Sequence, residues 1–157
     1  MMQISDYITV NRVKADMQST SKQDALVELA QLVTNGREPA VKDQLVRVLG
    51  ERERLASTGI GEEIAIPHGK LNAVGTLVVG LGRSAQGVDF ESVDGKPTRL
   101  FFVLVAPENS TGIHLKALAR ISRLCKEPAF CSRLLAAPTS DEMYHILCQE
   151  DSKFSGK

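Results

Sequence analysis

His68 occupies a position from which a side chain could carry out covalent chemistry. It lies between Pro67, which fixes the backbone φ angle, and Gly69, which has no side chain to obstruct a partner. The triplet follows Ile64–Ile66, a short apolar stretch that predicts a buried strand, and ligands of open α/β sheets bind at strand ends. Because neutral imidazole is a good nucleophile, His68 is a candidate to carry a covalent intermediate. A structural histidine is the alternative that the residue type alone leaves open.

Arg52 is the first of two side chains that could assist at such a site. It continues the apolar stripe of a helix that begins at Pro39, so we expect it to face the body of the fold. Its planar guanidinium presents a fork of donors that matches phosphate oxygens. A capping or surface role for this arginine is the structural alternative.

His114 is the second assisting candidate. It falls in the first turn of another predicted helix, where the positive end of the helix dipole favours an anion and lowers the pKa of an imidazole. His114 is therefore predicted to act as a neutral hydrogen-bond donor or orienter. Packing on the apolar side of its helix is the alternative.

Helices and strands alternate in the elements that must position these residues. Helical spacing with capping and stop signals predicts helices at Ser21–Val33, from Pro39 onward, at Gly112–Lys126, at Pro128–Ala136 and, capped by Ser140, at Asp141–Cys148. Apolar runs predict buried strands at Ile64–Ile66, Thr76–Leu81 and Leu100–Val105, with a turn at Asp94-Gly95. This order indicates an α/β sandwich in which helices cover a sheet. Asp151–Lys157 is expected to be a flexible tail.

The composition indicates one neutral domain. The 157 residues contain no repeat or linker, and their formal net charge of zero argues against a protein that binds nucleic acid through phosphate contacts. The longest apolar run, Leu100–Ala106, is far shorter than the roughly 20 residues of a bilayer span, and the N-terminus lacks a secretory signal, so no membrane insertion is expected. The three cysteines have no metal-like spacing. We therefore expect a cytoplasmic protein with reduced thiols and no metal or other cofactor.

The segment Ser57–Gly69, STGIGEEIAIPHG, resembles a known family signature. It is similar to the active site of type-2 enzyme IIA domains of the bacterial phosphoenolpyruvate-dependent phosphotransferase system, the fructose, mannitol and nitrogen-regulatory group. The resemblance covers about residues 4–149 and is strongest to the nitrogen-regulatory branch. It implies a single domain over residues 1–157, with a mixed β-sheet flanked by helices on both faces.

The resemblance also implies roles for residues of this chain. The histidine of the PHG triplet, here His68, is transiently phosphorylated in that family. An arginine that falls on Arg52 helps to hold the phosphoryl group, and a second histidine that falls on His114 lies beside the first. Further support on the phosphate side is expected from the loop and the triplet, at Ser57, Thr58, Gly59, Gly61 and Gly69. Ordinary turn chemistry explains the loop residues nearly as well.

Glu62 and Glu63 bear on this site through their charge. Carboxylates that faced a phosphohistidine would disfavour it, because like charges repel. Glycine is common in the family where Glu63 stands. We expect both glutamates to be rim residues that point to solvent, and an inward-facing one would weaken phosphorylation.

The resemblance implies a phosphocarrier that takes a phosphoryl group from the phosphohistidine of an HPr-type carrier. No metal is expected, because the donor is not a nucleotide. In the output that we favour, a regulated partner protein, such as a potassium-transport or sensor protein, reads the phosphorylation state. The alternative is a transport IIA that passes the group to a cysteine of an enzyme IIB. A binding module with a vestigial site, silenced by Glu62 and Glu63, is the alternative from another class.

Overall fold

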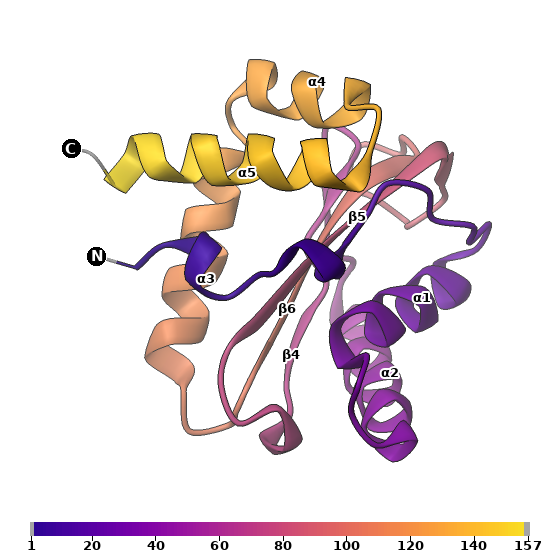
Figure 1. Ribbon diagram of the computed structural model, residues 1–157. Helices are drawn as coiled ribbons and strands as arrows, with labels where there is room; N and C mark the ends of the chain where they lie inside the picture. Colours follow the sequence, from indigo (N-terminus) through magenta and orange to yellow (C-terminus); the bar gives the residue numbers. More distant parts are fainter. Residues whose placement is uncertain (1, 156–157) are drawn as a thin grey trace.

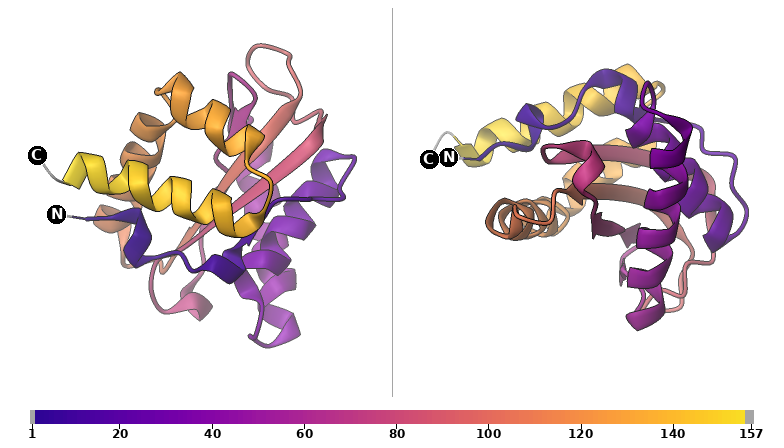
Figure 2. Two further views of the ribbon diagram at one scale, coloured as in Figure 1. Left: turned by 45° about the horizontal axis from the view of Figure 1, so that its top comes forward. Right: turned by 90° about the horizontal axis from the view of Figure 1, so that it is seen from below.

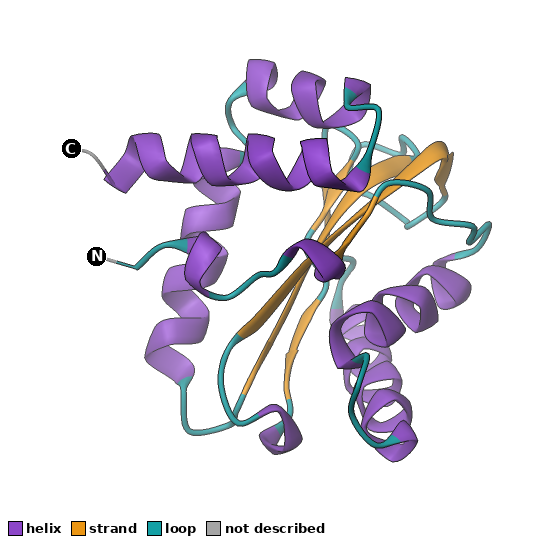
Figure 3. Ribbon diagram, viewed as in Figure 1, coloured by secondary structure: helices purple, strands orange, loops and turns teal. Residues whose placement is uncertain are grey.

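The computed structural model describes residues 2–155 and consists of a β-sheet between two groups of helices (Figure 1). The strands are β1 (Val13–Lys14), β2 (Gly59–Gly61), β3 (Ile64–Ala65), β4 (His68–Lys70), β5 (Val78–Val88) and β6 (Thr98–Ala106). The helices, purple in Figure 3, are α1 (Lys22–Thr34), α2 (Pro39–Leu55), α3 (Thr111–Leu124), α4 (Pro128–Ala136) and α5 (Ser140–Ser155). No helix in this described part of the chain combines the length and the apolar character that crossing a membrane requires.

The sheet is mixed, and β6 is its central strand. The strand order is β1-β5-β6-β3-β2, and β4 also pairs with β6. β5 runs antiparallel to β6, whereas β3 and β4 both run parallel to it, one after the other. Pro67 separates these two short strands because it has no N–H to donate to the ladder. The strand that was predicted to end at the PHG triplet therefore resumes at His68 as β4.

Helices lie on both faces of the sheet (Figure 2), and each face carries a separate apolar core. Residues of β6 alternate between them, as the period of a strand requires. The side that packs against α3, α4 and α5 carries Leu100, Phe102 and Leu104. The side that packs against α1 and α2 carries Phe101, Val103 and Val105. The expected mixed sheet with helices on both faces is confirmed.

Local sequence signals account for the starts of three helices. The hydroxyl of Ser21 accepts a hydrogen bond from the backbone N–H of Asp24 at 3.1 Å and caps α1. Pro39 and Pro128 occupy the first positions of α2 and α4, where the missing N–H costs nothing. These starts agree with the sequence.

The C-terminal helix α5 differs from its prediction at both ends. Its cap is Thr139, whose hydroxyl accepts from the N–H of Glu142 at 3.1 Å. The hydroxyl of Ser140, the expected cap, instead accepts from the N–H of Ala15 at 2.9 Å. The helix runs to Ser155, so the expected flexible tail is wrong for residues 151–155, while residues 156–157 lie outside the described residues.

Asp151 explains why α5 continues. Its carboxylate is fully buried, and it accepts hydrogen bonds from Nε of Arg120 at 2.5 Å and from the N–H of Ser5 at 3.0 Å. A buried carboxylate is tolerated only when it is paired and hydrogen-bonded. The partners come from α3 and from the N-terminal segment, which are distant in sequence.

Arg83 of β5 fixes the end of α4, and its loss is expected to destabilise the fold. Its Nη1 donates to the carbonyls of Leu134, Leu135 and Ala137 at 2.9, 3.3 and 2.6 Å, where helix carbonyls lack partners within the helix. Arg83→Met should lower the free energy of unfolding by about 2–4 kcal/mol, measured by urea denaturation. The exposed Arg47 provides the control, because Arg47→Met should change stability by less than about 0.5 kcal/mol. Equal losses would contradict this role of Arg83.

The turn between β2 and β3 places Glu62 and Glu63 in the left-handed region, with φ of 55° and 67°. This conformation costs a residue with a Cβ roughly 1–2 kcal/mol. Glu63→Gly should therefore raise the free energy of unfolding by about 0.5–1 kcal/mol in chemical denaturation. The ion pair that it removes, to Arg99 at 3.6 Å, is partly exposed and contributes little. A loss of stability would show that the ion pair outweighs the backbone conformation.

Candidate functional site

His68 has one ring nitrogen bound to the backbone and the other beside a cation. Its Nδ1 lies 2.8 Å from the carbonyl oxygen of Ile66, and its Nε2 lies 3.3 Å from Nε of Arg52. A carbonyl only accepts a hydrogen bond, and a guanidinium only donates one. From these partners we assign the proton to Nδ1 and the lone pair to Nε2. The free nucleophilic atom of His68 is thus Nε2.

Strand β4 sets the position of this ring. His68 pairs in parallel register with Leu104 of β6, and the N–H of Leu104 donates to the carbonyl of Pro67 at 3.0 Å. The side chain of His68 is half-buried. The candidate nucleophile therefore lies on the sheet itself and not on a loop after it.

Arg52 lies in the last turn of α2, where this helix approaches β4. Its Nη1 donates to the carbonyl of Ala56 at 2.8 Å, so the guanidinium is held while Nε faces His68. Gly69 allows the approach, because a Cβ at this position would lie 2.5 Å from Cγ1 of Val48 in α2. Arg52 faces the body of the fold, as its place in the helix predicts.

His114 is buried beside His68. The two ring centroids are 5.5 Å apart at an interplanar angle of 73°, and His114 is 4% exposed. Burial, followed by the charges of His68 and Lys70, lowers the pKa of His114 to about 4. Burial is thus the main cause of the shift, and the backbone N–H of His114 is already bound to the carbonyl of Ser110 at 3.0 Å.

The state of the second histidine follows from this burial. At neutral pH the imidazole of His114 is uncharged. Its Nδ1 is buried with no hydrogen-bond partner among residues 2–155. Since His114 lines the same pocket as His68, its other ring nitrogen, Nε2, is the candidate to serve a group bound there.

Burial also lowers the pKa of His68, and the charge of Arg52 acts in the same direction. The hydrogen bond to Ile66 and the carboxylate of Glu53 oppose the shift. The neutral form of His68 consequently persists below the ordinary histidine pKa. A nucleophile in this site stays available as the solution becomes mildly acidic.

The buried neutral histidines make the free energy of unfolding depend on pH. The unfolded chain takes up a proton at His114 near pH 6.5, whereas the folded chain does so near pH 4. Because the unfolded chain binds more protons in between, stability falls as the pH drops through this window. We expect a loss of about 1–2 kcal/mol between about pH 7 and pH 5 in urea unfolding, and a smaller loss in His114→Gln. An unchanged pH dependence in that variant would contradict the assignment.

The three candidates line one surface pocket of about 670 Å³, called the His68 pocket here. Its lining is His68, Arg52 and His114 together with Val48, Glu51, Leu55, Gly69, Lys70, Glu108, Thr111, Leu115 and Leu118. Lys70 was not singled out from the sequence, and its Nζ donates to the Thr111 hydroxyl at 2.8 Å. Residues two apart on a strand share a side. That spacing would have identified Lys70 if the strand had been continued past the proline.

Ser57, Gly59 and Gly61 lie outside the His68 pocket. The hydroxyl of Ser57 donates to the carbonyl of Phe90 at 2.7 Å and accepts from the N–H of Gly59 at 3.1 Å. Gly61 lines a different pocket. The structure therefore places Gly69 in the same pocket as His68, but not these loop residues.

Thr58 is also outside this pocket, but its hydrogen bonds connect the elements that carry Arg52 and His68. Its hydroxyl and its N–H both bind the carboxylate of Glu53, which is buried and paired with Lys22 at 3.1 Å. Its carbonyl accepts from the N–H of Ile66 at 3.0 Å. Thr58 thus joins the end of α2 to the chain that leads into His68. No local pattern identified Glu53, because its partners are set by the tertiary fold.

Glu62 and Glu63 do not line the His68 pocket. Glu62 is exposed, and Glu63 is partly exposed beside Arg99. Neither glutamate faces the His68 pocket, and both line a different one. Over residues 2–155, no group of three or more histidine, cysteine or acidic side chains is arranged to hold a metal ion.

Comparison with known proteins gives consistent matches. The family model for "Phosphoenolpyruvate-dependent sugar phosphotransferase system, EIIA 2" matches residues 6–150. A PTS fructose-specific EIIABC component from Bacillus subtilis is 34% identical over 150 residues, 96% of this chain but only 24% of that relative's length. A nitrogen regulatory protein from Bradyrhizobium diazoefficiens is 38% identical over 149 residues, 93% of this chain and 95% of the relative. The crystal structure of nitrogen regulatory protein IIA-Ntr from Neisseria meningitidis superposes with a TM-score of 0.83 at 29% identity, and covers 92% of this chain and 98% of that one.

Proposed function

Since the chain belongs to the EIIA 2 family of the phosphoenolpyruvate-dependent sugar phosphotransferase system, we propose that it is a phosphocarrier whose His68 accepts a phosphoryl group on Nε2. The observation that carries this proposal is the 3.3 Å contact between Nε2 of His68 and Nε of Arg52. It places the lone pair of a nucleophile and a phosphate-binding cation at the same point of one surface pocket.

The transfer requires no proton movement at His68. The Nε2 lone pair attacks the phosphorus of the donor phosphohistidine and forms a P–N bond, while the bond from phosphorus to the donor imidazole breaks. The donor ring, which carries a proton on its other nitrogen, leaves with its electron pair as neutral imidazole. Nδ1 of His68 keeps its proton, which is bound to the Ile66 carbonyl. The lowered pKa of His68 keeps the nucleophile neutral.

Three neighbouring side chains stabilise the negative charge of the incoming phosphoryl group. Arg52 exchanges its contact with Nε2 for phosphoryl oxygens, and its bond to Ala56 keeps the guanidinium in place. His114, which is neutral, donates from Nε2 to a phosphoryl oxygen. Lys70 lines the same pocket and adds a second positive charge. Phosphoryl transfer depends on this kind of positioning and charge stabilisation.

The rim of the pocket suits a protein donor. Leu55 is 83% exposed and Leu115 is 59% exposed, and both line the His68 pocket. Exposed apolar side chains around a polar centre are typical of sites that a protein partner covers. We propose an HPr-type phosphocarrier as this partner.

The phosphorylation state is proposed to act as a regulatory signal. The Bradyrhizobium relative, which matches over nearly its whole length, is a nitrogen regulatory protein. The fructose-specific relative is an EIIABC component, of which this chain spans only about a quarter. Members of this family thus occur with B components, and an enzyme IIB cysteine is the alternative acceptor for this chain.

Phosphoryl uptake tests the proposal. The protein is incubated with phosphoenolpyruvate, enzyme I and an HPr-type carrier, and intact mass is measured. We expect the added mass of one phosphoryl group, which is lost in acid and retained in base, and no addition when the carrier is omitted. The His145→Gln variant, altered at an exposed histidine outside the pocket, should behave as the wild type. No adduct on the wild type would overturn the proposal.

A second experiment separates regulation from transport. The purified phosphoprotein is mixed with a IIB domain, and the IIB mass is followed over time. A regulatory component should retain its phosphoryl group, whereas a transport IIA should transfer it to the IIB cysteine within the time of a control IIA–IIB pair.

A further inference from the structure

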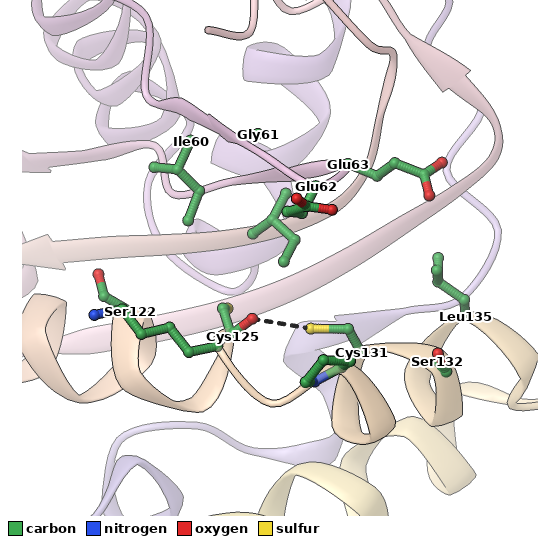
Figure 4. A pocket seen from close by; sticks show the side chains of 12 residues that line it. Ile60, Gly61, Glu62, Glu63, Ser122, Cys125, Cys131, Ser132 and Leu135 are labelled. Atoms are coloured by element: carbon green, nitrogen blue, oxygen red, sulfur yellow. Dashed lines mark hydrogen bonds between the residues drawn. The ribbon is translucent and has the colours of Figure 1, made fainter. Parts of the chain in front are cut away.

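A second surface pocket of about 760 Å³ lies where α3 meets α4, and we call it the thiol pocket (Figure 4). It shares no lining residue with the His68 pocket. One wall is the β2–β3 turn, with Ile60, Glu62 and Glu63, and the other wall carries Cys125 and Cys131. Nothing in the proposed phosphocarrier chemistry uses these residues.

The fold brings the two cysteines of this pocket together. Cys125 directly follows the last residue of α3, and Cys131 lies in the first turns of α4, which begins at Pro128. The Cys131 thiol donates to the carbonyl oxygen of Cys125 at 3.5 Å, the dashed line of Figure 4. The two thiols are also close enough to influence each other's pKa. Both are partly exposed and unbridged.

The two thiols are chemically unequal. The hydrogen bond from Cys125 lowers the pKa of Cys131, because it stabilises the thiolate. The same bond, with burial, raises the pKa of Cys125. A thiol of lowered pKa next to a thiol of raised pKa is the arrangement in which one sulfur attacks and the other resolves the product.

We propose that Cys125 and Cys131 form an oxidisable dithiol, which a hydroperoxide that enters the thiol pocket closes into an intramolecular disulfide. The Cys131 thiolate attacks one peroxide oxygen and becomes a sulfenic acid, while the other oxygen leaves and is protonated to water or alcohol. The Cys125 sulfur then attacks the sulfenic sulfur, and the hydroxyl leaves as water with the proton of Cys125. Two thiols are oxidised by two electrons and one peroxide is reduced.

The lining of the thiol pocket explains how a peroxide reaches these cysteines and why Cys148 is spared. Ser122, Ser132 and Lys126 line it beside the thiols, so a small polar oxidant meets hydrogen-bonding groups there. The third cysteine, Cys148, does not line this pocket, and its thiol interacts with Tyr144 of α5. Oxidation should therefore join Cys125 to Cys131 and spare Cys148.

Hydrogen peroxide followed by mass spectrometry tests this inference. The whole protein is treated with hydrogen peroxide at neutral pH, alkylated under denaturing conditions and weighed. We expect the wild type to lose the mass of two hydrogen atoms and to take up one alkyl group instead of three. Peptide mapping should show Cys125 linked to Cys131, and a dithiol reductant should restore three alkylation sites.

Matched variants decide the outcome. Cys148→Ser should form the disulfide at the wild-type rate, whereas Cys125→Ser and Cys131→Ser should not form it. Cys131→Ser should react with peroxide more slowly than Cys125→Ser. A wild-type disulfide that includes Cys148, or three free thiols after peroxide, would overturn the inference. The His68→Gln variant should oxidise normally, so failure here is independent of the phosphocarrier proposal.

Discussion

His68→Gln is expected to abolish phosphoryl uptake completely. Glutamine is polar and of similar length, so it can replace the hydrogen bonds of His68 to Ile66 and Arg52. Its amide has no nucleophilic nitrogen, and no P–N bond can form. Intact mass after incubation with phosphoenolpyruvate, enzyme I and the HPr-type carrier should show no added phosphoryl group. The variant should fold normally, because the side chain is only half-buried.

His114→Gln is the matched control, because it alters the neighbouring imidazole in the same pocket. It should still acquire one phosphoryl group, but more slowly, since His114 is assigned a supporting hydrogen bond. If His114→Gln lost the adduct and His68→Gln kept it, the roles of the two histidines would be reversed.

Arg52→Gln is expected to slow phosphoryl uptake by about 10²–10³-fold. The substitution removes the donors that face Nε2 of His68 and leaves the nucleophile in place. Because the charge of Arg52 helps to lower the pKa of His68, that pKa should rise. The rate should therefore decline at a higher pH than in the wild type. Rapid-quench measurement of uptake across a pH series tests both effects.

Two further variants distinguish a specific role of the Arg52 guanidinium from an unspecific effect of changing the end of α2. Arg54→Gln removes a cation from the same last turn of α2, outside the His68 pocket, and should leave the rate unchanged. Arg52→Lys retains the charge without the planar fork and should give an intermediate rate. Equal rates for Arg52→Gln and the wild type would remove Arg52 from the mechanism.

Much of the fold followed from local signals. Pro128 begins α4 where it was predicted, and Ser21 caps α1, because these residues act on their own helix ends. Strand β4 was missed, since three residues gain strand geometry only from pairing with β6. The end of α5 was missed for a similar reason. Asp151 reads as a polar tail residue until its partner Arg120 is known.

The residues of the candidate site also fall into those that local patterns predicted and those that depend on tertiary packing. The positions of His68 and Arg52 were predictable, because a contiguous motif and one helix stripe carry them. The approach of His114 to His68 depends on how α3 packs on the sheet, and only the family resemblance indicated it. The loop before the triplet was placed beside the phosphate, but Ser57 and Thr58 satisfy their hydroxyls elsewhere.

Gly69 has a consequence for how this site can vary. Because α2 approaches the backbone of β4 at this glycine, the separation between guanidinium and imidazole is set by steric contact as well as by side-chain reach. A substitution there would displace α2 and separate the two groups, although neither reacting residue had changed. Positions 48 and 69 are therefore coupled in size, so that a larger residue at one requires a smaller one at the other. A natural variant changed only at position 48 or 69 would therefore lose phosphoryl transfer even though every charged residue of the His68 pocket is unchanged.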